Sequence, residues 1–494
     1  MTLPQQTAAS TAISNRVAKG GIAVGASTLI RSLLEFAATL VTARLLTPAD
    51  FGLVGMVLAV VGFVDMFKDM GLATITVQRE HLSREELNGL FWLTAAVGTG
   101  LALLTAAAAP LISWGYGQPA LTKITLVLSS CLLLSGLSVQ HQALLRRELK
   151  FERLAVVQSV GTLASVVTVI GGALMGLGVW ALVLKQVAGP LASGVAAWLA
   201  MRWQPGRPPR NAGLRELLQM GRHVTGFQVA NYVERNLDNV LIGRFAGAVP
   251  LGCYARAYDL LRLPLQQIAD PAGTVAMPTL SRLISEPARY RDAYLRMARS
   301  VLLFTVPLTP FLVLCADWLI ELAFGPQWLL AIPMFQWLGL SLLVKPLSFT
   351  LGWLLISQGR TRELWRWGVA ATAMAVVAFA FGLHWGAIGV AAAYALLDLV
   401  VRTPLLFQLV GRRGPVSVRD LLGLLVQPWA CAAAVALALF ALRHFAPPSL
   451  GPGLGSAIAA VLTLGVTAGV TWSTAEGRRS VQDLAALLRR QKVA

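Results

Sequence analysis

The sequence predicts an all-α protein that crosses a membrane about fourteen times. Of its 494 residues, 56% are hydrophobic and 13% are charged, and the mean hydropathy is +0.67. These values lie far outside the range of soluble globular proteins. Apolar runs of helical length recur along the whole chain, each about long enough to cross a hydrocarbon core of roughly 30 Å. Lipid is therefore the expected surrounding of most of the chain.

Each predicted span ends at a charge cluster or at a group of prolines and glycines. The fourteen spans cover residues 21–46, 51–71, 89–114, 121–144, 153–175, 177–201, 214–243, 249–280, 297–316, 329–357, 363–383, 385–410, 420–443 and 453–473. The seventh and eighth are the weakest, because both are amphipathic and carry charges. Hydropathy alone would miss them.

Lysine and arginine are concentrated in alternate connections. The N-terminus, the connections from even to odd spans and the C-terminal tail are basic, as in residues 146–153. The opposite connections hold little more than Arg44, Lys123, Arg244 and Arg443. Because cytoplasmic loops retain positive residues, both termini are expected to be cytoplasmic, which requires an even number of spans. The same distribution explains the net charge of +18 through topology and contacts with anionic lipid, so no nucleic-acid partner is expected.

An internal repeat appears when the chain is shifted by 200 residues. The shift places Gly21, Val24, Arg44 and Gly52 on Gly221, Val224, Arg244 and Gly252. Since an even number of spans separates the copies, the repeat predicts two pseudo-symmetric six-helix lobes in the same orientation, followed by two C-terminal helices. The expected parts are a cytoplasmic N-terminus (1–20), an N-lobe (21–202), a linker (203–213), a C-lobe (214–411), an appendage of two helices (412–475) and a basic cytoplasmic tail (476–494).

Ionisable residues inside the spans are concentrated in the first, second, seventh and eighth, which occupy equivalent places in the two lobes. Burying a charge at membrane depth is expensive, so these residues are candidates for a shared hydrophilic cavity that contacts the cargo. They are Arg31, Glu35, Asp65, Lys68, Asp69, Arg222, Glu234, Arg235, Asp238, Arg256, Asp259, Arg262 and Asp270. Elsewhere in the spans, ionisable residues such as Lys185, Lys345 and Asp398 look isolated.

A purely structural role is the alternative for these charges. Arg31 and Glu35 are spaced i,i+4, and three further pairs are spaced i,i+3, so each pair shares a helix face and could neutralise itself. The i,i+3 pairs are Asp65 with Lys68, Arg235 with Asp238 and Asp259 with Arg262. If the cargo is anionic, arginine is its expected partner, because the guanidinium binds phosphate oxygens in a bidentate manner. The neighbouring carboxylates would suit coupling to protons or sodium ions.

Signatures of common enzymes are absent from the sequence. It contains no GxxxxGK[ST] loop, HExxH motif or GxSxG elbow, and its five histidines are far apart. The four cysteines have no CxxC spacing and are expected to be small buried apolar residues. No cofactor, metal or catalytic residue is therefore expected, and transport is favoured over catalysis. The cysteines are Cys131, Cys253, Cys315 and Cys431.

The stretch KDMGLATITVQREHLSREELNGLFW (68–92) resembles a signature of the polysaccharide transporter branch of the multidrug/oligosaccharidyl-lipid/polysaccharide (MOP) exporter superfamily, the Wzx-like flippases. Further blocks are similar to the same family in the same order. They are ARLLTPADFGLVGM (43–56), QALLRRELKFERLA (142–155), GVWALV (178–183) and NLDNVLIGRFAGAVPLGCYARAYDLLRLPLQQI (236–268).

The resemblance implies a MATE-like fold of two six-helix lobes plus two helices, working by alternating access. The implied cargo is an undecaprenyl-diphosphate-linked oligosaccharide, moved across the bacterial inner membrane for lipopolysaccharide or exopolysaccharide synthesis. Its partners would be that lipid-linked oligosaccharide, membrane lipids and polysaccharide polymerase or chain-length proteins. The alternatives are another cargo on the same fold, either a cell-wall lipid-linked precursor or a drug, or else a membrane glycosyltransferase or polymerase, or a scaffold for polysaccharide assembly.

Overall fold

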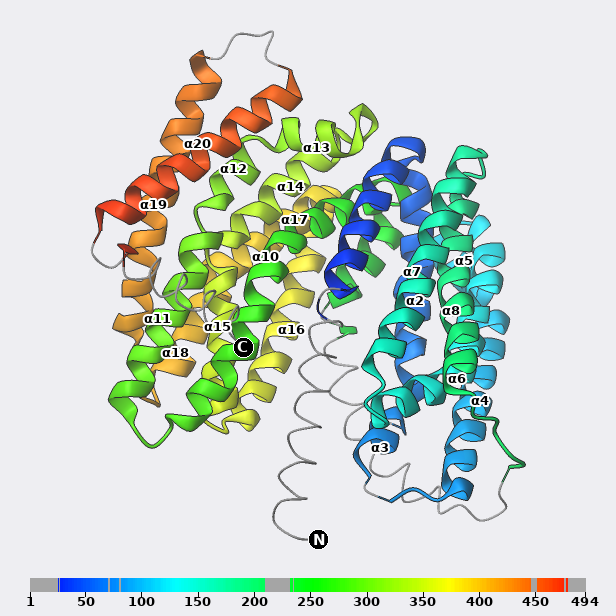
Figure 1. Ribbon diagram of the computed structural model, residues 1–494. Coiled ribbons are helices and arrows are strands. Elements are labelled where there is room, and N and C mark those ends of the chain that lie inside the picture. The colour runs from blue at the N-terminus through cyan, green and yellow to red at the C-terminus, as the bar shows by residue number, and fades with distance from the viewer. Residues whose placement is uncertain are drawn as a thin grey trace. The chain divides into compact units, whose positions relative to one another are not determined.

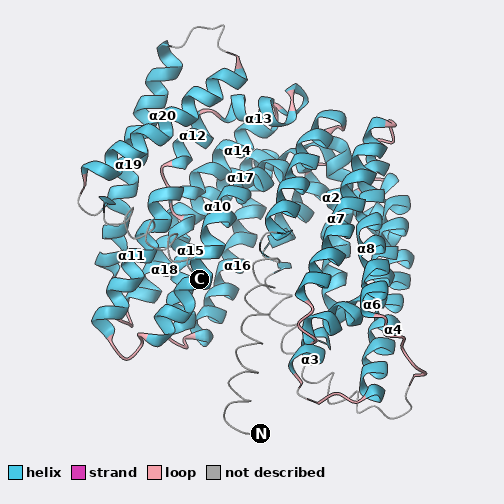
Figure 2. Ribbon diagram, viewed as in Figure 1, coloured by secondary structure: helices cyan, strands magenta, loops and turns pink. Residues whose placement is uncertain are grey.

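The computed structural model is helical throughout its described part. It describes residues 25, 27–69, 72–79, 81–208, 232–233, 235–445, 451–474 and 477–478, and only the backbone of Asp69 and of residues 263–271. Within these residues Figure 2 shows helices and connecting loops but no strand. The predicted N-terminal segment, most of the seventh span and nearly all of the basic tail lie outside the described residues. The chain divides into two compact units, Met1–Val249 and Pro250–Ala494, and the predicted lobe boundary stays a prediction.

The first unit contains six of the predicted spans as long helices. Residues 27–45 are helical, and so are residues 235–245 near the end of the unit. Between them α7 packs along α8, and α6 packs against both α4 and α8. The helices labelled in this unit in Figure 1 are α2 (Pro48–Asp69), α3 (Leu72–Gln78), α4 (Arg84–Ala107), α5 (Ala109–Tyr116), α6 (Ala120–Arg147), α7 (Phe151–Leu174) and α8 (Val179–Met201).

A capping box fixes the start of α4. The Ser83 hydroxyl accepts a hydrogen bond from the Glu86 N–H at 3.1 Å, and the Glu86 carboxylate accepts one from the Ser83 N–H at 2.8 Å. Each side chain thereby satisfies a backbone donor that has no partner within the helix. The predicted span began at residue 89, whereas α4 begins five residues earlier because this cap lies in the polar segment before the apolar run.

The second unit begins within α10, near its N-terminus. Its helices are α10 (Ala248–Arg282), α11 (Pro287–Thr305), α12 (Leu308–Leu314), α13 (Ala316–Phe324), α14 (Ala331–Leu340), α15 (Lys345–Ser357), α16 (Thr361–Gly382), α17 (Gly386–Leu396), α18 (Thr403–Gly411), α19 (Val418–Phe445) and α20 (Pro452–Ser473), with short segments η1 (Pro326–Trp328), η2 (Ser341–Leu343), η3 (Leu383–Trp385) and η4 (Leu397–Arg402). A buried core joins α11, α15, α18 and α19 through residues such as Tyr294, Leu351, Phe407 and Leu421.

The length and composition of the helices show a multi-pass membrane protein. Among the described residues, nine helical stretches are long and apolar enough to cross a membrane, or ten if α14–η2 and α15, bent by 45°, form one span. Large apolar side chains such as Leu103 and Val377 are more than two-thirds exposed, as expected of a surface that faces lipid. The helix α10 is not one of the nine, although it is 35 residues long. The sequence correctly predicted that this helix exists and that hydropathy would miss it.

Residues 361–411 form one of the nine stretches but contain a sharp turn. Gly386 lies at φ 65°, a conformation that favours glycine, and α16 packs against α17 after the turn. A Cβ atom on Gly389 would lie 2.1 Å from the carbonyl oxygen of Gly382, so both helices need glycine to approach this closely. The stretch is therefore a helical hairpin, as the separate spans 363–383 and 385–410 predict.

Ion pairs near the ends of helices connect residues that the charge pattern puts on the same side of the membrane. On the predicted cytoplasmic side, the Arg291 guanidinium binds the Asp420 carboxylate, with Nε–Oδ2 at 2.9 Å. On the opposite side, Arg443 donates to both carboxylate oxygens of Asp317 at 2.7 and 2.6 Å. These contacts support the alternation of the predicted connections. Which side is cytoplasmic stays a prediction.

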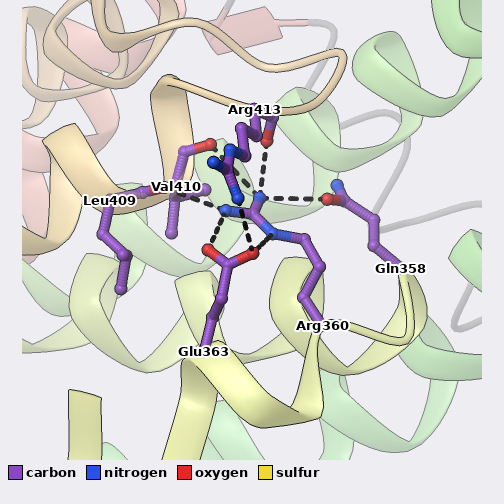
Figure 3. A network of polar contacts seen from close by, with 6 residues as sticks. All are labelled: Gln358, Arg360, Glu363, Leu409, Val410 and Arg413. Carbon is purple, nitrogen blue, oxygen red and sulfur yellow. Dashed lines mark hydrogen bonds and ion pairs between the residues drawn. The ribbon is translucent and has the colours of Figure 1, made fainter. Parts of the chain in front are cut away.

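Arg360 joins the start of α16 to the end of α18 in the second unit (Figure 3). Its guanidinium binds Glu363 with Nε–Oε1 at 3.2 Å and Nη2–Oε2 at 2.7 Å. It also donates to the carbonyl oxygens of Leu409, Val410 and Arg413, at or just after the end of α18. The last carbonyl groups of a helix have no partner within the helix, so Arg360 caps α18 from a distance. The side chain is only 12% exposed.

Candidate functional site

The charged residues of the helix at 27–45 are tied to their surroundings separately. The Arg31 guanidinium donates to the carbonyl oxygen of Ser27 at 3.3 Å and to the hydroxyl of Thr28 at 3.1 Å. The Glu35 carboxylate accepts a hydrogen bond from the hydroxyl of Thr162 on α7 at 3.3 Å. Glu35 therefore connects two helices, which the i,i+4 pairing with Arg31 did not predict.

Near the end of α2, Asp65 and Lys68 form the predicted i,i+3 ion pair. The Lys68 ammonium lies 2.7 and 2.9 Å from the two carboxylate oxygens, and its side chain is 18% exposed. This short geometry is that of a charge-assisted hydrogen bond. Asp69 follows on the same helix, but its side chain lies outside the described residues, as do Arg222, Glu234 and the side chain of Asp270.

The seventh span is described only at its end. Asp238 is buried at 8% exposure, and one carboxylate oxygen accepts a hydrogen bond from the backbone N–H of Asn239 at 2.8 Å. Arg235, one turn earlier on the helix, is exposed. Nearby, the Tyr232 hydroxyl donates to the carbonyl oxygens of Leu58 and Ala59, which ties this segment to α2 within the first unit.

On α10 the ion pair differs from the one that spacing predicted. Asp259 pairs with Arg256, with Nη2–Oδ2 at 2.7 Å, and not with Arg262. Both arginines are three residues from Asp259, so spacing alone cannot choose between them. Arg262 is exposed and instead lines a pocket described below.

A second charge cluster joins residues that look isolated in the sequence. The ammonium of Lys345, at the start of α15, donates to the hydroxyl of Tyr394 on α17 at 2.6 Å and lies 3.7 Å from the carboxylate of Asp398. The other oxygen of Asp398 accepts from Arg402 at 3.1 Å. The rings of Tyr394 and Tyr258 lie 4.4 and 5.8 Å from the ammonium, within range of cation–π attraction. We call these five residues the Lys345 cluster.

Sequence reasoning missed the Lys345 cluster because its members are far apart in the chain. Lys345 is 53 residues before Asp398, and only tertiary packing brings them together. One local signal was available. Asp398 and Arg402 are spaced i,i+4 in an otherwise apolar span.

Two of the segments that carry the cluster, those with Lys345 and with Asp398, are irregular at this place. The α14–η2 and α15 segments meet at a bend of 45° around Val344, immediately before Lys345 and Pro346. Asp398 and Arg402 lie on η4, a single π-helical segment between α17 and α18. Proline accounts for the first break, since its ring cannot continue the hydrogen-bond ladder of a preceding helix. Such π-helical segments are frequent at functional sites.

A pocket opens next to Lys345 within the second unit. Its volume is about 40 Å³, and its lining residues are Tyr258, Leu261, Arg262, Leu338, Ser341, Leu342 and Lys345. The described lining contains two cations and no carboxylate. The pocket can therefore donate hydrogen bonds to an anionic group.

The chain is similar to known proteins of polysaccharide biosynthesis. Residues 41–333, more than half of the chain, match a family described as "Polysaccharide biosynthesis protein". The teichuronic acid biosynthesis protein TuaB of Bacillus subtilis (strain 168) is 27% identical over 62% of this chain and 64% of its own length, so slightly less than two thirds of that relative is covered. The lipopolysaccharide biosynthesis protein WzxC of Escherichia coli (strain K12) is 24% identical over 73% of this chain and 74% of its own.

Among solved structures, the lipid II flippase MurJ in an inward closed conformation is similar over nearly the whole chain. The TM-score is 0.73, and the match covers 91% of this chain and 98% of MurJ. Sequence identity is 14%, so the likeness shows a shared fold alone.

Proposed function

Because this chain belongs to the polysaccharide biosynthesis protein family, we propose that it is a flippase for undecaprenyl-diphosphate-linked oligosaccharides. It turns repeat units from the inner to the outer leaflet of the bacterial inner membrane by alternating access, for lipopolysaccharide or exopolysaccharide synthesis. The family match over residues 41–333 is the observation that carries the proposal. The MurJ-like fold over 91% of the chain supports it, since that neighbour is a lipid flippase.

We further propose fourteen transmembrane helices in two six-helix lobes plus two. Counting the bent pair as one span and residues 361–411 as two gives eleven from the nine apolar stretches. Three further helices carry the intramembrane charges, namely residues 27–45, the seventh span and α10. These three bring the total to fourteen, with both termini in the cytoplasm.

The intramembrane charges suit a cargo with a polar head and a lipid tail. In this proposal, arginines of the first, seventh and eighth spans bind the diphosphate, because a guanidinium stays charged in a low-dielectric site and pairs with two phosphate oxygens. The carboxylates beside them release the arginines when the site opens again, or couple the cycle to protons or sodium ions. The prenyl tail stays in lipid, so the protein shelters only the sugar and the diphosphate.

Two substitutions test these roles. Arg235→Ala removes an exposed cation, and Asp259→Asn removes the negative charge that lies 2.7 Å from the Arg256 guanidinium. Polysaccharide export is expected to fall at least several-fold in both variants while the amount of protein in the membrane is unchanged. Arg362→Ala, which removes an exposed arginine at a helix start, is the matched control. Normal export in both test variants would remove these residues from the mechanism.

The proposed function itself is tested by deleting the protein and analysing lipid-linked intermediates by mass spectrometry. Complete repeat units on undecaprenyl diphosphate should build up on the cytoplasmic side of spheroplasts, and expression of the wild-type protein should clear them. If the repeat units stay incomplete, the protein acts before translocation, as a glycosyltransferase would. If they reach the outer leaflet normally, the flippase proposal fails, and another cargo on the same fold becomes the better reading.

A further inference from the structure

We propose that three spans of the second unit share a hinge, about which an outer group of helices tilts against an inner group during transport. The inner group, on the predicted cytoplasmic side, is α11, α15 and α18, and the outer group is α12, α14 and α17. The hinge is inferred from contacts within the second unit, and only its use in transport rests on the proposed function.

Each of these spans passes from one group to the other at a break marked by proline. The helix α12 begins directly after Pro307, and Pro346 and Pro404 are the second residues of α15 and α18. Proline has no N–H to continue the hydrogen-bond ladder of a helix. The break before α15 bends its span by 45°, and the break before α18 is the π-helical segment η4. Prolines and π-helical segments are the usual origins of kinks, so the spans can change direction here.

The helices on the two sides of the breaks pack into separate groups. The buried core of the second unit joins the inner helices and α19 through residues such as Leu302, Leu351 and Phe407. It contains no residue of α12, α14 or α17, and all three of these helices are fully described. The helix α14 packs instead against α12 and α17. Hinge motions are absorbed by a few residues at the ends of elements while the packed groups move as bodies, and the breaks supply such residues.

A side chain from a neighbouring helix holds the bend in place. The indole N–H of Trp429 donates to the carbonyl oxygen of Leu343, the last residue of η2, at 3.1 Å. Broken helices are tolerated in a membrane where neighbouring helices satisfy the freed backbone groups in this way. Trp429 follows Pro428, which lies inside α19. The helix α19, which packs against both groups, therefore has its own proline beside the break and can follow a tilt.

The breaks in two of the spans are joined to each other. The ammonium of Lys345, the first residue of α15, donates to the hydroxyl of Tyr394 on α17 at 2.6 Å. One turn further along α15, the hydroxyls of Ser348 and Thr403 lie 3.2 Å apart. The first contact crosses from the inner to the outer group through a flexible side chain, and the second holds the inner helices together. The two spans should therefore bend together.

The size of the motion follows from the length of the outer helices. The 10 residues of α14 and the 3 residues of η2 extend over roughly 20 Å. A tilt of about 15° at Val344 would move the outer end of α14 by about 5 Å. Double electron–electron resonance between spin labels measures a change of this size.

Spin labels on the purified full-length protein report the tilt. In a cysteine-free background, one label is placed at Leu329, which is exposed just before α14. The second label is placed at Arg419, exposed at the start of α19, or in a separate sample at Arg289, exposed on α11. Two reference points are needed because a tilt perpendicular to one distance leaves that distance unchanged.

The test variant combines Pro346→Ala with Pro404→Ala and so returns two N–H donors to the breaks. We expect a shift of about 3 Å or more in at least one of the two mean distances, because restored hydrogen bonds straighten the spans. Polysaccharide export should fall by about fivefold or more while the amount of protein in the membrane and the Tm do not fall. The control is Pro287→Ala, which replaces a proline in the first turn of α11 and should change neither measurement.

A structural role for the prolines predicts a different result. If the double variant exports as well as the control, transport does not need the breaks and the inference is overturned. Loss of export with both distances unchanged overturns it as well, because the loss then has another cause. If the Tm of the double variant falls, Trp429→Phe, which keeps a ring but removes the donor to Leu343, must itself shift a distance and lower export. Wild-type behaviour of that variant overturns the inference.

Failure of the hinge and failure of the proposed function can be told apart. The distances are measured without cargo, so they report the hinge whatever the protein transports. Clearance of repeat units by the wild-type protein in cells reports the flippase function whether or not the second unit bends.

Discussion

Removing the Arg360 guanidinium should strongly lower the free energy of unfolding, although Arg360 is not one of the charged residues within the predicted spans. The side chain is 12% exposed and binds the Glu363 carboxylate and three carbonyl oxygens around the end of α18 (Figure 3). Each hydrogen bond to a charged group is worth about 1.5–3 kcal/mol, but bonds made by one group are not additive. Breaking a buried ion pair by removing one partner costs about 3–5 kcal/mol. We therefore expect Arg360→Ala to lower the free energy of unfolding by about 3–5 kcal/mol.

Graded variants separate charge from geometry. Arg360→Lys keeps the charge but cannot reach Glu363 and three carbonyl groups at once, so about 1–2 kcal/mol should be lost. Glu363→Gln keeps the guanidinium on the carbonyl groups and should lose about as much. The assay is unfolding in mixed micelles, followed by reaction of a fluorogenic maleimide with Cys253, Cys315 and Cys431, which are buried in the folded protein. Arg362→Ala is the exposed control. Equal destabilisation by Arg360→Ala and Arg362→Ala would refute the reasoning.

Three further predictions concern stability and topology. Burial raises the pKa of Asp317, but hydrogen bonds and charge from Arg443 outweigh this effect and hold the pKa below its usual value. The stabilisation by this ion pair is fully present above the unfolded pKa of about 3.9 and is lost as the pH falls through the lowered folded pKa. The Tm difference between wild type and Arg443→Gln should therefore be constant from pH 8 to pH 5 and shrink below about pH 4. A constant difference down to pH 3 would contradict the role of Asp317. Gly389→Ala puts a Cβ 2.1 Å from a carbonyl oxygen and should cost about 1–3 kcal/mol of unfolding free energy, and unchanged unfolding would mean that α16 and α17 separate easily. In a cysteine-free background, Lys123→Cys should react with an impermeant maleimide added to intact cells and Arg146→Cys only after permeabilisation; the reverse pattern would invert the orientation. The control for Arg443→Gln is Arg296→Gln, which alters an exposed arginine, and the control for Gly389→Ala is Gly368→Ala, where an added Cβ meets no atom within 4 Å.

The sequence predicted the existence of helices better than their ends. The eighth span was expected at 249–280, and α10 covers Ala248–Arg282, because the repeat outweighed the charges within it. The ninth was expected to begin at residue 297, but α11 begins at Pro287. Its first turns carry arginines, which resemble a loop in hydropathy, yet Tyr290 and Tyr294 are buried on one face. Hydropathy measures average polarity and does not detect an amphipathic extension.

The candidate site was predictable only where its contacts are local. The Asp65–Lys68 pair follows from i,i+3 spacing on one helix. The Lys345–Asp398 contact depends on how α15 packs against η4, and the bond from Thr162 to Glu35 depends on how α7 packs against the first helix. No periodicity within one segment contains such information.

Contacts near the ends of helices also restrict how often the second unit crosses the membrane. Two residues in contact at one face must be separated by an even number of crossings. Arg360 donates to the carbonyl oxygen of Arg413, so residues 361–411 between them cross an even number of times, which fits the two proposed spans. Arg443 binds Asp317, and the segments between these residues are α14–α15, the 361–411 hairpin and α19. In the proposed arrangement the hairpin and α19 cross three times, and an even total then requires the bent pair to cross once.

In the proposed arrangement of spans, Lys345 lies near the centre of the bilayer. A re-entrant α14–α15 pair would put Asp317 and Arg443 on opposite faces, which their contact excludes. The pair extends from Ala331 to Ser357, and Lys345 lies close to its middle. At a rise of about 1.5 Å per residue, the ammonium is roughly 20 Å from either end of the span. Charges are most costly to bury at this depth, and the fold supplies partners for them: the Tyr394 hydroxyl accepts a hydrogen bond from Lys345, and the Asp398 carboxylate pairs with Arg402.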